Sequence, residues 1–185
     1  EGLWVNPETK ETRCPTKELA EKIKTEVNRQ EAEVIESEAE IKRMPPPQLF
    51  DLTTLQRDAN RLFGYSAQQT LDYAQSLYEK KLLSYPRTDS RYLTREMEQM
   101  ISQLAPAVTA VFPYTAGLNL PVHTAQVIDD SKVSDHHAII PTQSMLRSNL
   151  VSLPIGEADI LQLVCVRLLC AVGNPHTWDE TTVKL

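Results

Sequence analysis

The sequence is poor in the features that define several protein classes. Its three cysteines, Cys14, Cys165 and Cys170, are too few and too badly spaced for a disulfide framework or a zinc site. Cys165 and Cys170 fall in an apolar run with helical character, so we expect small buried side chains and a reducing compartment. No apolar run approaches the length needed to cross a bilayer, and no signal-peptide pattern is found.

Positive charge is also scarce. The chain has 19 Lys and Arg against 25 Asp and Glu, a net charge of −6, which argues against nucleic-acid binding by bulk electrostatics. Residues 1–44 and 105–185 each carry −3, whereas 45–104 are neutral, and three arginines face one aspartate within 84–95. A local cationic spot on an acidic body indicates a site for one or a few phosphates.

The length of 185 residues suggests one domain or one and a part, and the hydrophobic fraction of 41% is ample for a core. There is no internal repeat and no low-complexity segment. Because the chain lacks an initiator Met, we expect Glu1 to be a boundary within a longer protein.

The first part of the chain predicts a helix and a strand. Thr16 is a plausible N-cap for an amphipathic helix that reaches about residue 29. From 32 to 44 the pattern alternates, which predicts a half-buried strand with Glu36, Glu38 and Glu40 on its outer face. Those carboxylates are interpreted as a solvated face rather than a metal site. Three prolines at 45–47 then mark a domain boundary.

The rest of the chain predicts mainly helices. Thr53 with Gln56 and Ser66 with Gln69 have capping-box spacing, and Gly64 between them suits a left-handed C-cap, so we expect a helix-turn-helix-like unit. Further helices are expected over 94–104 and 157–171, with loops and a wing-like hairpin over 120–142 and a strand from 177. The predicted fold class is α+β, mostly α.

The segment Leu83–Leu93 carries the strongest chemical signal. Pro86 fixes its own φ and favours an extended Tyr85, which places the phenol on a stiff turn. A phenol has a pKa near 10 and becomes a useful nucleophile when a cation stabilises the developing charge. Arg87 offers a planar fork suited to phosphate oxygens. Tyr85 and Arg87 are therefore a candidate nucleophile and phosphate clamp; the alternative is an aromatic side chain that packs a helix-to-loop junction.

The same segment, Leu83-Ser84-Tyr85-Pro86-Arg87-Thr88-Asp89-Ser90-Arg91-Tyr92-Leu93, resembles the active-site tyrosine segment of type IA DNA topoisomerases, in the topoisomerase III form. Three further segments resemble the family in the family's order, and they are Gln56–Asn60, Ser66–Glu79 and Asp135–Thr142. The resemblance covers roughly residues 45 to 142.

This resemblance implies a helical tyrosine-bearing domain, with helix-turn-helix or winged-helix character, inserted into a strand-rich gate domain. Residues 49–173 would form the tyrosine domain, and 1–48 and 174–185 would be two pieces of the gate. Tyr85 would cleave single-stranded DNA, with Arg87 and His136 on the phosphate and His137 structural. The implied DNA-contacting residues are Gln75, Glu79, Ser84, Asp89 and Arg91.

The family also needs an acidic Toprim domain that binds Mg²⁺. No Asp-x-Asp signature for it is present, so we expect the chain to lack that domain, to bind no metal and to be inactive alone. The implied partners are single-stranded DNA and the Toprim domain of the same parent chain, with no membrane. A monomeric fragment from a cytoplasmic, nucleoid-associated enzyme is expected.

Two alternatives stay open. A non-catalytic DNA-binding or gate module would use the helix-turn-helix-like unit and dispense with Tyr85. A tyrosine recombinase or type IB-like nuclease would gather arginines and a histidine before the tyrosine. Here Arg87 and His136 follow it, which argues against the second alternative.

Overall fold

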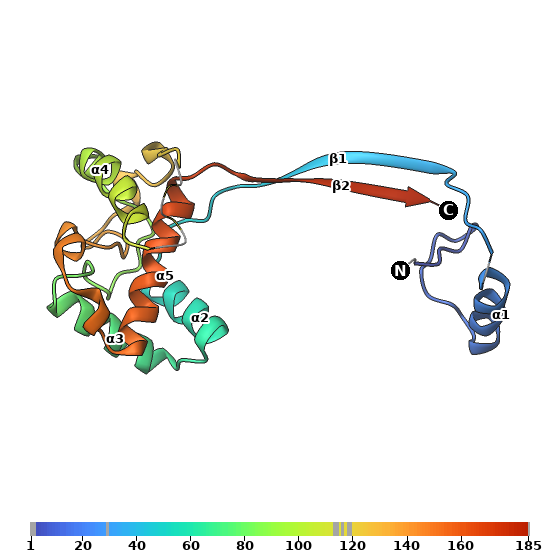
Figure 1. Ribbon diagram of the computed structural model, residues 1–185, viewed down its shortest axis with the longest axis horizontal. Coiled ribbons are helices and arrows are strands. Elements are labelled where there is room, and N and C mark those ends of the chain that lie inside the picture. Colours follow the sequence, from blue (N-terminus) through green and yellow to red (C-terminus); the bar gives the residue numbers. More distant parts are fainter. Residues whose placement is uncertain (1–2, 29, 113–114, 116, 118–119, 185) are drawn as a thin grey trace. The chain divides into compact units, whose positions relative to one another are not determined.

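The computed structural model describes residues 3–28, 30–112, 115, 117 and 120–184. The α-helices and strands are α1 (Lys17–Val27), β1 (Glu36–Met44), α2 (Leu52–Phe63), α3 (Ala67–Glu79), α4 (Glu98–Thr109), α5 (Ile155–Val172) and β2 (His176–Lys184) (Figure 1). Short 3-10 helices span Arg95–Met97, Thr124–Gln126, Asp130–Lys132, Gln143–Arg147 and Leu150–Ser152. This predominantly helical α+β architecture confirms the predicted fold class.

The chain divides into two compact units. One comprises residues 1–42 and 179–185, and the other comprises residues 43–178. The helical unit is thus inserted in the sequence between the two segments of the first unit. The assignment of 1–48 and 174–185 to a gate domain stays a prediction.

The helix of the first unit begins as the sequence predicts. Thr16 is the N-cap of α1, and its side chain accepts a hydrogen bond of 3.2 Å from the backbone N–H of Leu19. The helix ends at Val27 with Asn28 as C-cap; residue 29, the predicted end, lies outside the described residues. No residue of α1 is buried.

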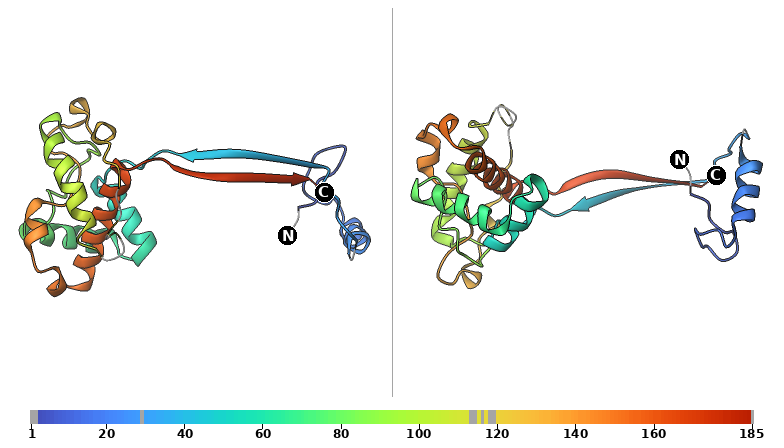
Figure 2. Two further views of the ribbon diagram at one scale, coloured as in Figure 1. Left: turned by 45° about the horizontal axis from the view of Figure 1, so that its top comes forward. Right: turned by 90° about the horizontal axis from the view of Figure 1, so that it is seen from below.

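The prediction that β1 is half-buried is wrong. β1 and β2 pair into a two-stranded sheet, and their arrows point in opposite directions (Figure 2). Both faces of this ribbon are open within the described residues, so Ile35 and Ile41 remain 72% and 64% exposed. The carboxylate of Glu36 pairs with Lys184 and that of Glu40 with Lys42, in agreement with a solvated charged face.

The core of the second unit is built around α5. This helix contacts α2, α3 and α4, and Figure 1 shows it running past all three. The apolar side chains that α5 buries include Ile160, Leu161, Val164 and Leu168. A buried carboxylate, Glu157, ties α5 to α3 through an ion pair with Lys80 and a 2.8 Å hydrogen bond from Ser76.

The two helix starts predicted by capping boxes have different outcomes. Ser66 and Gln69 form a reciprocal capping box on α3, as expected. For α2 the predicted cap, Thr53, is wrong: Asp51 is the N-cap and forms the box with Thr54. Gly64 ends α2 with φ +74°, which is the predicted left-handed C-cap.

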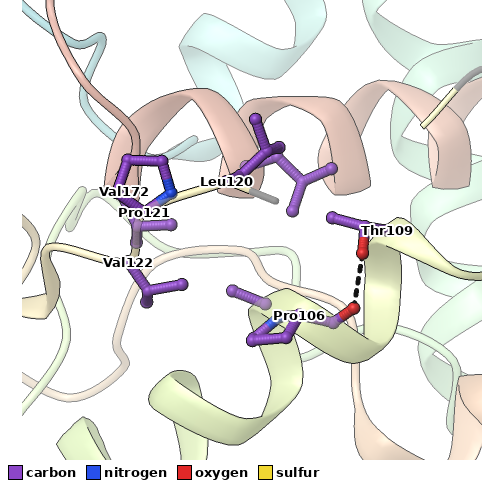
Figure 3. A pocket seen from close by; sticks show the side chains of 8 residues that line it. Pro106, Thr109, Leu120, Pro121, Val122 and Val172 are labelled. Atoms are coloured by element: carbon purple, nitrogen blue, oxygen red, sulfur yellow. Dashed lines mark hydrogen bonds between the residues drawn. The ribbon is translucent and has the colours of Figure 1, made fainter. Parts of the chain in front are cut away.

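Helix α4 continues past Pro106 to Thr109, whereas the sequence predicts that this helix ends at about residue 104. The proline removes one backbone donor, but the apolar stripe goes on, and Leu104, Ala105 and Val108 are buried. Beside the proline lies a small apolar cavity of about 80 Å³ between α4, α5 and the segment 120–122. Figure 3 shows Thr109 donating to the carbonyl oxygen of Pro106 on its rim.

The predicted wing-like hairpin over 120–142 is also wrong. This segment contains two 3-10 turns and makes isolated bridges, Leu93 with Ile128, Phe50 with Ile139 and Leu83 with Pro141. The backbone of 120–142 therefore pairs with the tyrosine segment and with Phe50, near the start of the second unit, and does not form a hairpin with itself.

The cysteines differ in their environments. Cys165 is buried in α5, and burial raises the pKa of its thiol to about 12. Cys170 is exposed, contrary to the prediction, and Cys14 is half-buried. In the described ranges, no helix combines the length and apolar character that a membrane span requires.

Candidate active site

The last turn of α3 delivers the chain to Tyr85. After Glu79 the helix is capped at Lys80, and Lys81 takes the left-handed conformation with φ +61°. The N–H of Leu82 then bonds back to the carbonyl of Leu77 over 2.8 Å. Leu82 and Leu83 are buried and anchor the strand-like segment that follows.

Backbone hydrogen bonds join the tyrosine segment, Leu83–Leu93, and the residue before it to the histidine segment, Asp135–Thr142. The N–H of Ser84 donates to the carbonyl of Ile140 over 2.9 Å, and the N–H of Thr142 donates to Leu82 over 3.0 Å. The Ser84 hydroxyl donates to the carbonyl of Ala138 and accepts from the N–H of Ile140. Ser84, a predicted DNA contact, thus has its hydroxyl hydrogen engaged within the protein.

These contacts bring two predicted catalytic side chains together. The ring centroids of Tyr85 and His136 lie 4.4 Å apart, with the ring planes inclined at 47°. On another side, Tyr85 meets the ring of Tyr78 edge-on at 5.3 Å. Tyr85 is half-buried, whereas His136 is exposed. The ring of Tyr85 therefore packs against two other rings, while the residue remains partly accessible to solvent.

Arg87 and Asp89 are exposed on the same segment. Within the described part of the chain, neither side chain makes a hydrogen bond or an ion pair. Pro86 and Thr88, which alternate with them, are buried. The segment is thus held by its inward residues and presents Arg87 with all five guanidinium donors available for a ligand.

Arg91 has a different setting. Its Nε donates to Oδ2 of the buried Asp51 over 2.8 Å, and a second guanidinium N–H reaches Oε1 of Gln48 over 3.3 Å. Burial alone would raise the pKa of Asp51, but hydrogen bonds from Thr54 and Arg91 outweigh it and hold that pKa below its usual range. Arg91, a predicted DNA contact, is mainly engaged in fixing the start of α2.

The remaining predicted residues lie on α3 and in the histidine segment. Gln75 donates a 3.0 Å hydrogen bond to Glu79 one turn later. His137 has its Nδ1 2.8 Å from the carbonyl oxygen of Ala138, which suits the structural role predicted for it. Among the residues described, no three His, Cys, Asp or Glu side chains gather where they could hold a metal ion.

Three further residues of the site are not predicted from the sequence. Tyr78, in the last turn of α3, is 40% exposed and contacts Tyr85. Thr88 donates from Oγ1 to the carbonyl oxygen of His136 over 3.0 Å, and Asp51 holds Arg91. The spacing of seven residues between Tyr78 and Tyr85 does not predict their contact, because the contact depends on the left-handed turn at Lys81.

The site thus combines a tyrosine and an exposed arginine on one segment with a histidine from a second segment, on a mainly helical scaffold. Comparison with known families matches residues 1–185 to the family described as DNA topoisomerase. The chain therefore belongs to the DNA topoisomerase family, and it is a topoisomerase III-like member of the type IA class.

Individual relatives agree with this assignment. The chain is 38% identical over 189 residues to DNA topoisomerase 3 of Shouchella clausii, and the alignment covers 98% of this chain and 25% of that protein. It is 35% identical over 187 residues to DNA topoisomerase 3 of Bacillus subtilis, in an alignment that covers 97% of this chain and 25% of that protein. The chain thus spans about a quarter of the length of these curated relatives.

A solved structure shares the fold. Full-length topoisomerase I from Thermotoga maritima matches with a TM-score of 0.67 and 24% identity, over 99% of this chain and 29% of that one.

Proposed function

We propose that this chain is the strand-cleaving part of a type IA DNA topoisomerase, with Tyr85 as the nucleophile. Tyr85 Oη attacks a backbone phosphorus of single-stranded DNA, and the 3′ oxygen of the neighbouring nucleotide leaves. The products are a 5′-phosphotyrosyl ester and a free 3′-hydroxyl. After another strand passes, the 3′-hydroxyl attacks the ester and restores the backbone. The ester retains the phosphodiester energy, so no ATP is required.

The observation that carries this proposal is the contact of Tyr85 with a histidine from a second segment, on a stretch of chain that also exposes an arginine. The rings of Tyr85 and His136 lie 4.4 Å apart, and Arg87 follows two residues later without a protein partner among the described residues. In our proposal the Arg87 guanidinium binds the scissile phosphate and stabilises the charge that grows on it. His136 contacts a nearby phosphate oxygen.

The surrounding residues have supporting roles in this proposal. Asp89, exposed two residues after Arg87, orients the guanidinium or joins the hydrogen bonds around the phenol. Gln75 and Glu79, which bond each other on α3, contact the DNA beside Tyr78. Ser84 and Arg91 contribute less directly, because each is already bonded within the protein.

The metal step belongs to another part of the enzyme. We assign Mg²⁺ to a Toprim domain outside this chain. The described residues would bind and orient the DNA and supply the nucleophile. The isolated chain is accordingly proposed to be monomeric, to bind single-stranded DNA weakly and to be inactive. The parent enzyme would act in the cytoplasm on the nucleoid.

A covalent-trapping experiment tests the proposal. The chain is produced together with the upstream domain and incubated with end-labelled single-stranded DNA and Mg²⁺, and denaturant traps the product. The parent is compared with Tyr85→Phe and with Tyr92→Phe. Tyr92 is a matched control, because it lies in the same segment and its hydroxyl accepts a 2.6 Å hydrogen bond from Gln48.

We expect a protein–DNA adduct with the parent and with Tyr92→Phe, and none with Tyr85→Phe. An adduct that persists in Tyr85→Phe would contradict the proposal. The absence of an adduct with folded, DNA-binding parent protein would favour the non-catalytic DNA-binding or gate module instead.

A further inference from the structure

Tyr78 has an unusual position for a residue of an amphipathic helix. It lies in the last turn of α3, is 40% exposed, and its hydroxyl makes no hydrogen bond within the described part of the chain. Its neighbour Leu77 is fully buried. The side chain thus gives little to the core, and among the described residues its ring packs against that of Tyr85.

The backbone around Tyr78 is held firmly. Ser76 and Lys80, which lie two residues before and two residues after Tyr78, bind the buried carboxylate of Glu157 on α5. The carbonyl of Tyr78 accepts from the N–H of Lys81 over 2.8 Å. The left-handed Lys81 then reverses the chain, and Thr142 fixes that turn by donating from Oγ1 to the carbonyl of Lys81.

This turn brings Tyr85 back against Tyr78. The ring centroids are 5.3 Å apart and the planes are inclined at 76°, the edge-to-face geometry that aromatic pairs favour. The ring of His136 contacts Tyr85 at 4.4 Å and comes from a separate segment. Two rings on fixed backbones therefore restrict the rotamers open to Tyr85.

From these contacts we infer that Tyr78 is a positioning residue for the nucleophile: its ring, acting with that of His136, holds the phenol of Tyr85 in the orientation for in-line attack. The inference rests on the proposed function of Tyr85. Orientation of a reacting group contributes directly to rate, so loss of the ring lowers the rate of cleavage more than DNA affinity. The ring, and not the Tyr78 hydroxyl, is the active feature, because the contact is edge-to-face.

The test compares Tyr78→Ala and Tyr78→Phe with the parent, in protein that includes the upstream domain. Single-turnover cleavage of labelled single-stranded DNA is measured at saturating protein with Mg²⁺. The Kd for the same DNA and the melting temperature are measured alongside. We expect Tyr78→Ala to cleave about five- to tenfold more slowly, the effect of one aromatic pair. We expect its Kd and melting temperature to match the parent and Tyr78→Phe to cleave at the parental rate.

Four results would overturn the inference. Parental cleavage by Tyr78→Ala would show that the ring is not needed, and equal loss in both variants would assign the effect to the hydroxyl. A fall in cleavage with an equal fold-loss of DNA affinity would make Tyr78 a DNA-binding residue. A fall in cleavage together with a lower melting temperature would make it a structural residue. In each of these cases a Tyr85-dependent adduct in the parent leaves the proposed function standing. Only the absence of that adduct, or its persistence in Tyr85→Phe, removes the proposed function.

Discussion

Thr88 donates a hydrogen bond of 3.0 Å from Oγ1 to the main-chain carbonyl oxygen of His136, and this bond ties the tyrosine segment to the histidine loop. Thr88 is 8% exposed, and its Oγ1 also accepts from the N–H of Ser90. The buried hydroxyl of Thr88 thus helps to fix the position of the His136 backbone relative to the segment that carries Tyr85 and Arg87.

The first prediction concerns this bond. Thr88→Val keeps the shape but leaves the Ser90 N–H and the His136 carbonyl without this partner, so we expect a loss of about 1–2 kcal/mol in the free energy of unfolding. We also expect slower cleavage in the longer protein. Thr88→Ser keeps the hydroxyl and serves as the control. Parental stability and cleavage in Thr88→Val would show that the bond does not position His136.

The second prediction follows from the ion pair of Asp51 and Arg91. Asp51→Asn keeps a capping side chain for α2 but removes the charge, and we expect a loss of about 1–2 kcal/mol at neutral pH, since Arg91 is partly exposed. The pKa of Asp51 is held below its usual range in the folded state. Its stabilising effect is therefore full above the ordinary value near 3.9 and is lost as the pH falls through the folded pKa.

Urea unfolding of the parent and Asp51→Asn across this acid range measures the effect. The difference in unfolding free energy should shrink as the pH is lowered. A difference that stays constant with pH would mean that the charge of Asp51 contributes nothing.

The third prediction concerns the close packing of α3 against α5. A Cβ added at Gly156 would lie 2.4 Å from Cζ of Tyr73, so the ring must move. Because this ring also packs edge-on against Tyr65 at 5.2 Å, we expect Gly156→Ala to cost about 1–3 kcal/mol in unfolding free energy. The double variant Tyr73→Leu with Gly156→Ala should recover part of that loss relative to additivity. Additive effects in denaturant unfolding would refute the steric explanation.

The fourth prediction tests Arg87 as a phosphate ligand. Arg87→Ala should weaken binding of single-stranded DNA and reduce the slope of log K against log salt by about 0.7, the value for one neutralised phosphate on a single strand. Arg91→Ala is the matched control, because Arg91 is already paired with Asp51 and should change the slope less. Equal slopes for the parent and Arg87→Ala would exclude a direct phosphate contact.

Much of the helical framework was predictable from local sequence. Thr16, Ser66 and Gly64 act within one turn of their own position, and each one has the predicted capping role. The cap of α2 differs from the prediction because Asp51 and Thr53 are both favourable N-cap residues, and Asp51 is the one that Arg91, 40 residues away, also binds. The continuation of α4 past Pro106 likewise depends on burial of Val108 in the core.

The candidate site divides in the same way. Tyr85 and Arg87 stand out through their chemistry on one short segment, and His136 was found only through resemblance to a family. The contact of His136 with Tyr85 depends on pairing between segments far apart in the sequence, as in the bond from Ser84 to Ile140, 56 residues later. The exposure of β1 could not be predicted from the sequence either. Alternating apolar and polar residues predict a strand with one covered face, and the described residues provide no layer that covers it.

The most direct test of the central claim is the chemical identity of the linkage. The trapped adduct is digested with nuclease and trypsin and analysed by mass spectrometry. Cleavage after Lys81 and Arg87 releases the peptide Leu82–Arg87, in which Tyr85 is the single tyrosine. We predict that this peptide carries a nucleotide joined through its 5′ phosphate to Tyr85. A nucleotide on Tyr78 or Tyr92, or one joined through a 3′ phosphate, would contradict the account.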